Sequence, residues 1–146
     1  MAAQHLGRLL FTFGRLEMNV ALFLAGLHPD RDFDQEIVAA EKRTFGDKLD
    51  ALQVQLMDEL AADAEAEQAW AAWFEQARTL RALRNRFAHG RWACLPVQHQ
   101  IVHVVGLPGS PNQASTFYTL EALELEVRKA EQIAADFQRL RRTERP

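Results

Sequence analysis

Apolar residues at helical spacing are the feature of this chain that most restricts its fold. Between residues 4 and 27 they recur at steps of three and four, which is the period of one helix face. These residues are Leu6, Leu9, Leu10, Phe13, Leu16, Val20, Phe23, Leu24 and Leu27. Phe11, Met18 and Leu22 lie off this stripe. The pattern predicts a helix with two buried faces, and the second face is a candidate contact with another subunit.

A second helical stretch follows the first after a short break. We expect it to resume near Asp34, to bend or break around Thr44 and Gly46, and to continue through LDALQVQLMDEL. Thr44 is a candidate N-cap, and Asp47 lies in the first turn, where a carboxylate stabilises the helix dipole.

Two longer helices are expected nearer the C-terminus. One covers about residues 64–89, and Gly90 stands where a left-handed C-terminal cap belongs. The last helix is capped by Thr119, and its inward-facing residues follow the same helical period. These residues are Leu120, Leu123, Val127, Ile133, Ala134, Phe137 and Leu140.

Strand-forming residues lie between these two helices. Segments 92–97 and 100–105 have strand composition, and Pro96 places the first of them at a sheet edge. Residues 106–115 have the composition of a loop but lack the spacing of a phosphate-binding loop. We therefore expect an all-α fold, an antiparallel four-helix up-and-down bundle with a small β-hairpin inserted before the last helix.

The composition places the chain among ordinary globular domains. Its 146 residues are 48% hydrophobic and 25% charged, which predicts a single domain with a packed core. Because Cys94 is the only cysteine, an internal disulfide and a multi-cysteine zinc site are excluded. A lone cysteine fits a reducing cytoplasm. No charge-free apolar stretch of about 20 residues is present, so we expect no membrane partner.

The charge changes sign along the chain, although the net charge is only −3. Residues 30–75 carry thirteen acidic and four basic side chains, whereas residues 76–120 carry five arginines and no acid. A basic patch on an acidic protein is typical of a binder of anions such as phosphates. The alternative is that these arginines pair with the acidic segment across a helix interface.

The stretch RNRFAHGRW at residues 84–92 concentrates this positive charge at the end of the third expected helix. Asn85 and His89 are four residues apart, so they lie on one face and can share a hydrogen bond. Arg84 and His89 are five apart and diverge by roughly 140° in an ideal helix. If they act together, either the helix frays at His89 or a second copy of the chain supplies the missing partner.

Arginine and histidine together suit RNA cleavage without a metal. Arginine presents a rigid fork of donors to phosphate oxygens, and histidine transfers protons near neutral pH. In such a reaction the 2′-hydroxyl attacks the neighbouring phosphate while arginine stabilises the charged transition state. The alternative is structural, because helix C-termini attract Arg, His and a following Gly for reasons of dipole and capping.

The segment RNRFAH resembles the motif of HEPN domains (higher eukaryotes and prokaryotes nucleotide-binding), which has an arginine, a polar residue and, several residues later, a histidine. The context is also similar, because an insertion and a helix opened by YTLEAL follow it. The resemblance implies that residues 1–146 form a single HEPN-like helical domain. It implies a ribonuclease that needs no metal or cofactor and that dimerises to form a composite site. Such domains occur in toxin-antitoxin and antiviral systems, so any antitoxin or other regulator would be a separate protein.

Carried over by position, the resemblance implies roles for three residues. Arg84 would contact the scissile phosphate, His89 would be the acid-base group, and Asn85 would orient His89 or the substrate. From charge and position we add Arg81, Arg86 and Arg91 as candidate phosphate-binding residues.

Five further side chains have two interpretations each. Trp92 is either a base-stacking surface or core of the hairpin, and we favour the core. His99 and His103 have a metal-ligand spacing, but no carboxylate lies nearby in sequence, so we assign no metal. Glu17 and Asn19 either line the groove beside the third helix or complete the solvent edge of their own helix, and we favour the solvent edge.

Two other functions remain open from the sequence. The first is a non-catalytic module that binds a nucleotide, RNA or a protein through the same patch. The second is a structural dimerisation domain, for which the arginines should be fully paired with acids from residues 30–75.

Overall fold

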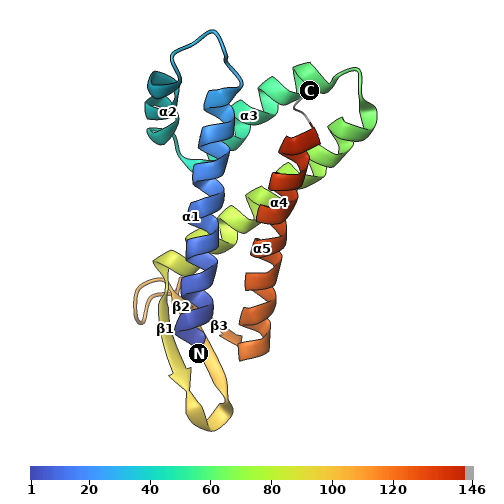
Figure 1. Cartoon of the computed structure of the whole chain (residues 1–146). Helices are drawn as coiled ribbons and strands as arrows, with labels where there is room; N and C mark the ends of the chain where they lie inside the picture. The colour runs from blue at the N-terminus through green and yellow to red at the C-terminus, as the bar shows by residue number, and fades with distance from the viewer. Residues whose placement is uncertain (144–146) are drawn as a thin grey trace.

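The computed structural model describes residues 1–143 of the chain. Helices make up most of this part, and a three-stranded antiparallel sheet precedes the last helix (Figure 1). The helices are α1 (Ala2–Gly26), α2 (Phe33–Glu41), α3 (Phe45–Leu60), α4 (Ala64–His89) and α5 (Leu120–Thr143). The strands are β1 (Arg91–Leu95), β2 (Gln100–Val105) and β3 (Ala114–Tyr118), in that order across the sheet.

The ends of the helices follow the local signals in the sequence. The predicted break at Thr44 is confirmed, because Thr44 caps α3 in a reciprocal capping box with Asp47. The Thr119 hydroxyl accepts a hydrogen bond from the Ala122 amide at the start of α5, as predicted. The bounds of α4 agree with the predicted residues 64–89.

The relative directions of the helices differ from the expectation. Arg8 pairs with Glu131, and Phe23, further along α1, contacts Phe137, further along α5. These two helices therefore run in the same direction, and the antiparallel up-and-down arrangement of four helices is not confirmed. The reason is α2, a separate nine-residue helix that reverses the chain before α3 begins (Figure 1).

The core lies where α1, α3, α4 and α5 meet. Trp70, Trp73 and Phe74 of α4 form its aromatic centre with Phe23 and Phe137. The Trp73 indole nitrogen donates to a backbone carbonyl of α5 at 3.0 Å, so this buried polar group is satisfied. The predicted stripes of α1 and α5 and the buried face of α3 supply most of the remaining core, although Leu10 of the predicted α1 stripe is exposed.

The second apolar face of α1 is exposed in a single chain. Phe11, Met18 and Leu22 are 73%, 60% and 39% exposed, so nothing within the described residues covers them. Of residues 1–143, α1 alone is long and apolar enough to cross a membrane by length and composition. Half of that apolar stretch is buried inside the structure, which the core helix of a globular protein also shows.

The expected hairpin is a sheet of three strands. The two predicted strands are present, although the first ends at Leu95 because Pro96 begins a 3₁₀ turn. Ala114–Tyr118 forms a third strand that pairs with β2, partly within the predicted loop. The segment ASTFY is too short to show strand periodicity by itself, so pairing with β2 decides its conformation.

Gly90 does not have the predicted left-handed conformation. Its φ of −97° and ψ of 172° are extended, because α4 continues directly into β1 rather than turning back. A Cβ at this position would overlap the imidazole ring of His103. Gly90 is therefore needed for close approach of β2 to the end of α4.

Candidate functional site

The stretch predicted to form the site spans the last turns of α4 and the first residues of β1. Because a helix turns by about 100° per residue, its side chains point in several directions. Some of them contact α1 or α3, some lie toward the sheet, and His89 projects into solvent.

Arg84 and Asn85 form a pair at the surface of α1. The Arg84 Nη1 donates to Asn85 Oδ1 at 2.9 Å, and both side chains are half-buried. The Arg84 guanidinium carbon also lies 4.8 Å from the centroid of the Phe13 ring, a cation–π contact. Asn85 therefore positions Arg84, and the predicted hydrogen bond between Asn85 and His89 is not among the bonds of the described residues.

His89 is the last residue of α4 and is exposed. Within residues 1–143 its imidazole makes no hydrogen bond, ion pair or ring contact, and no contact joins it to Arg84. This agrees with the divergence expected from their spacing of five residues. A single chain thus presents the two predicted catalytic groups separately.

The other three arginines of the predicted patch are dispersed. The Arg81 guanidinium lies against Gly46 at the start of α3, where a Cβ would be 2.9 Å from its Cζ. Arg86 stands beside the Phe87 ring, with its Cζ 5.9 Å from the centroid. Arg91 donates from Nη2 to the carbonyl of Gly106 at 2.7 Å. The three guanidinium groups therefore contact different parts of the fold.

Asp47 is the acid next to Arg81. Hydrogen bonds from the Thr44 hydroxyl and the Thr44 amide lower the pKa of Asp47, and the charges of Arg81 and Arg43 lower it further. An ionised carboxylate at this helix N-terminus thus compensates one of the patch arginines.

Trp92 belongs to the packed aromatic group behind the sheet. Its ring contacts Phe87, His103 and Tyr118, and its indole nitrogen donates to the Phe87 carbonyl at 3.1 Å. The half-buried ring and its used donor favour the packing interpretation over base stacking.

The two histidines with metal-ligand spacing lie in different environments. His99 ends a short 3₁₀ turn in the left-handed region, with φ of 51°, whereas His103 of β2 is 1% exposed. Burial lowers the pKa of His103; the nearby Arg86 charge lowers it further, while a hydrogen bond with the Arg86 backbone opposes this. No group of three His, Cys, Asp or Glu side chains in residues 1–143 is placed to hold a metal ion.

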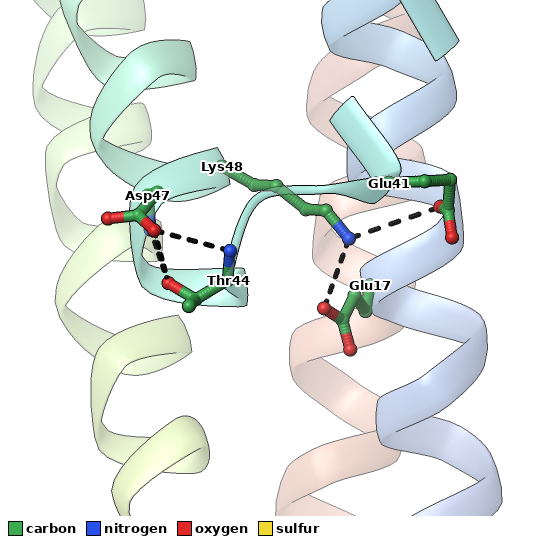
Figure 2. A network of polar contacts seen from close by, with 5 residues as sticks. All are labelled: Glu17, Glu41, Thr44, Asp47 and Lys48. Carbon is green, nitrogen blue, oxygen red and sulfur yellow. Dashed lines mark hydrogen bonds and ion pairs between the residues drawn. The ribbon is translucent and has the colours of Figure 1, made fainter. Parts of the chain in front are cut away.

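Glu17 does not complete the solvent edge of α1, the interpretation we favoured, because it takes part in a contact with α3 that the sequence did not predict. It pairs with Lys48 of α3 at 3.1 Å, and Lys48 is 3% exposed, with Glu41 at 4.0 Å as its second acid (Figure 2). Lys48 lies three residues after Phe45 and four before Leu52, so the apolar period already placed it on the buried face. Asn19 is half-buried on α1.

Comparisons with known proteins assign no relative. No family model matches the chain, and neither the curated proteins nor the solved structures contain a significant match. A function must therefore be argued from the chemistry of these residues.

Proposed function

We propose that this chain is a metal-independent endoribonuclease of the HEPN type, acting in the cytoplasm as a homodimer. The observation that carries the proposal is His89, an exposed imidazole at the end of α4 with no partner among residues 1–143, in a segment without acidic residues. Histidine is the side chain that most often transfers protons in catalysis, and an exposed imidazole is accessible to a substrate phosphate.

Each residue has a defined part in this reaction. Arg84 contacts the scissile phosphate and stabilises the charge that develops when the 2′-hydroxyl attacks. His89 takes the proton from the 2′-hydroxyl and gives it to the 5′-oxygen as the bond between phosphorus and that oxygen breaks, which leaves a 2′,3′-cyclic phosphate and a 5′-hydroxyl. Asn85 holds the Arg84 guanidinium in place. Because Arg84 and His89 diverge on one helix, the site joins Arg84 of one subunit to His89 of the other.

The apolar face of α1 supports a dimer. Phe11, Met18 and Leu22 form an exposed stripe that a second subunit would bury. A ribonuclease of this kind fits a toxin-antitoxin or antiviral system, with a separate antitoxin or regulator protein. The resemblance of RNRFAH to the HEPN motif is the basis for that context.

A second candidate is a non-catalytic module that binds a nucleotide, RNA or a protein. The observation that favours it is the state of Arg84, whose guanidinium already contacts Asn85 and the Phe13 ring. An arginine held in this way stabilises the fold and is less able to follow the charge that develops on a scissile phosphate, which favours binding without catalysis.

RNA cleavage in excess chelator tests the proposal. The pure protein should leave 2′,3′-cyclic phosphate ends, and His89→Ala or Arg84→Ala should abolish cleavage while the circular dichroism spectrum stays that of a folded helical protein. His99→Asn is the matched control, because His99 is also exposed and its left-handed backbone tolerates asparagine. No cleavage by the unmodified chain over a broad RNA panel would contradict catalysis. RNA binding without cleavage would favour the second candidate.

Mixing two inactive variants tests the composite site. If Arg84 and His89 come from different subunits, a heterodimer of Arg84→Ala with His89→Ala contains one intact site. Random exchange of subunits should then restore about a quarter of the original activity. No recovery after subunit exchange would show that each site uses a single chain.

A further inference from the structure

We propose that the outer face of the sheet is a stacking platform for single-stranded RNA, with Phe117 as the ring on which a base stacks. This proposal rests on the proposed function, because it names how the RNA strand would be held beside His89. It replaces Trp92, whose ring is packed on the inner face, as the base-stacking residue.

The register of the strands defines the two faces. Ala93, Val102 and Phe117 are aligned across β1, β2 and β3, so their side chains share one face. The adjacent row of Trp92, His103 and Thr116 therefore points to the other face.

Burial shows which face is open to solvent. His103 and Ile101 on the inner face are 1% and 5% exposed, because they pack toward α4. Phe117 on the outer face is 55% exposed, and Val102 beside it is half-buried. The Phe117 ring therefore stands at the surface on a rigid strand, which is the arrangement that stacking of a base requires.

The charge around this ring favours a nucleic acid. Arg91, Val104 and Ser115 form the next row of the outer face, and Arg91 is exposed. Arg91 uses Nη2 on the Gly106 carbonyl, which fixes the side chain and leaves other guanidinium donors for a phosphate. Strand spacings place Arg91 about 12 Å from Phe117 between Cα atoms, a separation that a nucleotide and its phosphate can bridge.

A protein partner fits this face less well. The sequence of the sheet and of the whole segment 76–120 contains no acidic residue, so nothing on this face repels an RNA backbone. Its apolar part consists of five side chains, which is small for a stable protein interface. They are Ala93, Leu95, Val102, Val104 and Phe117. A row of one aromatic ring, small apolar side chains and a neighbouring arginine is a combination that binds single strands without base-specific contacts.

Substitutions that separate the ring from its apolar area test the proposal. In a His89→Ala background, which prevents cleavage, fluorescence anisotropy measures binding of a labelled oligouridine of about 12 nucleotides. Phe117→Leu keeps an apolar side chain but removes the π face, so we expect the Kd to rise at least about fivefold. Phe117→Trp keeps a ring and should bind within about twofold of the parent.

Phe33→Leu is the matched control. Phe33 is also a half-exposed phenylalanine, 46% exposed, but it lies on α2 among acidic residues, so its loss should leave the Kd unchanged. Sedimentation velocity on the same proteins reports whether Phe117 mediates contact between chains.

The outcomes separate this proposal from the proposed function. If the His89→Ala parent and its Phe117→Leu variant bind the oligonucleotide equally well, base stacking on Phe117 is refuted while RNA binding by the protein stands. If the parent itself does not bind the oligonucleotide, both proposals fail. If Phe117→Leu changes the oligomeric state rather than the Kd, the outer face contacts another chain and the RNA platform is overturned.

Discussion

Two polar regions of this molecule use their charges in opposite ways. At the junction of α1, α2 and α3, Lys48 is buried and pairs with Glu17 and Glu41 (Figure 2). At the end of α4, His89 is exposed and has no partner within residues 1–143. The difference teaches that positive charge alone does not mark a binding site. What matters is whether the charged side chain is already paired with an opposite charge inside the fold.

The ion pairs at the junction are needed because Lys48 is removed from water there. A buried ammonium is tolerated only with close opposite charge, because removing it from water costs several kcal/mol. At the end of α4 the solvent supplies this solvation, so His89 needs no protein partner. The junction should therefore respond to substitution with lost stability, and the end of α4 with lost RNA cleavage.

Glu17→Ala should have the largest effect on stability. It leaves Lys48 buried with only Glu41, 4.0 Å away and 62% exposed, so we expect a loss of about 2 to 3 kcal/mol in the free energy of unfolding. Urea denaturation followed by circular dichroism measures this. Glu41→Ala, the control, should cost less than about 1 kcal/mol. Equal losses for the two variants would contradict the distinction between a buried and an exposed partner.

Gly90→Ala should have the next largest effect on stability. The new methyl group overlaps the His103 ring, and both lie in packed structure, so we expect a loss of about 1 to 3 kcal/mol. Combining it with His103→Ala should cost less than the sum of the two single losses, which a double-mutant cycle measures. Gly46→Ala is the control, because its methyl group meets only the movable end of Arg81 and should change stability by less than about 0.5 kcal/mol. Strict additivity would show that Gly90 does not serve to admit His103.

The pH dependence of stability should show a smaller effect of His103. Its pKa in the folded chain is lowered below the ordinary value of 6.5, chiefly by burial. The unfolded chain therefore binds this proton more tightly. As a result the stabilisation is complete above about pH 6.5 and is lost as the pH falls toward the folded-state pKa. Denaturation at a series of pH values should show a flatter profile for His103→Gln, and an unchanged profile would contradict this origin.

His89→Ala should have the smallest effect on stability and the largest on function. Because the side chain is exposed and unpaired among the described residues, we expect a change of less than about 0.5 kcal/mol in the free energy of unfolding. RNA cleavage should nevertheless be lost. A large loss of stability would mean that His89 belongs with the structural residues of the junction.

Local signals determined the elements that the sequence could predict. The apolar period predicted α1, α4 and α5, and the Thr44 and Thr119 caps predicted where two helices begin. The spacing of Arg84 and His89 also predicted that they would not meet within one chain. These features depend on residues within about one helical turn of each other, which is why a single sequence contains them.

Only the tertiary structure decided the rest. The reversal by α2 made α1 and α5 run parallel, and pairing with β2 made residues 114–118 a strand. The register turned Trp92 inward and Phe117 outward. The partner of Lys48 lies 31 residues away on another helix. Contacts at such separations are selected by burial and packing of the whole chain, so no local pattern contains them.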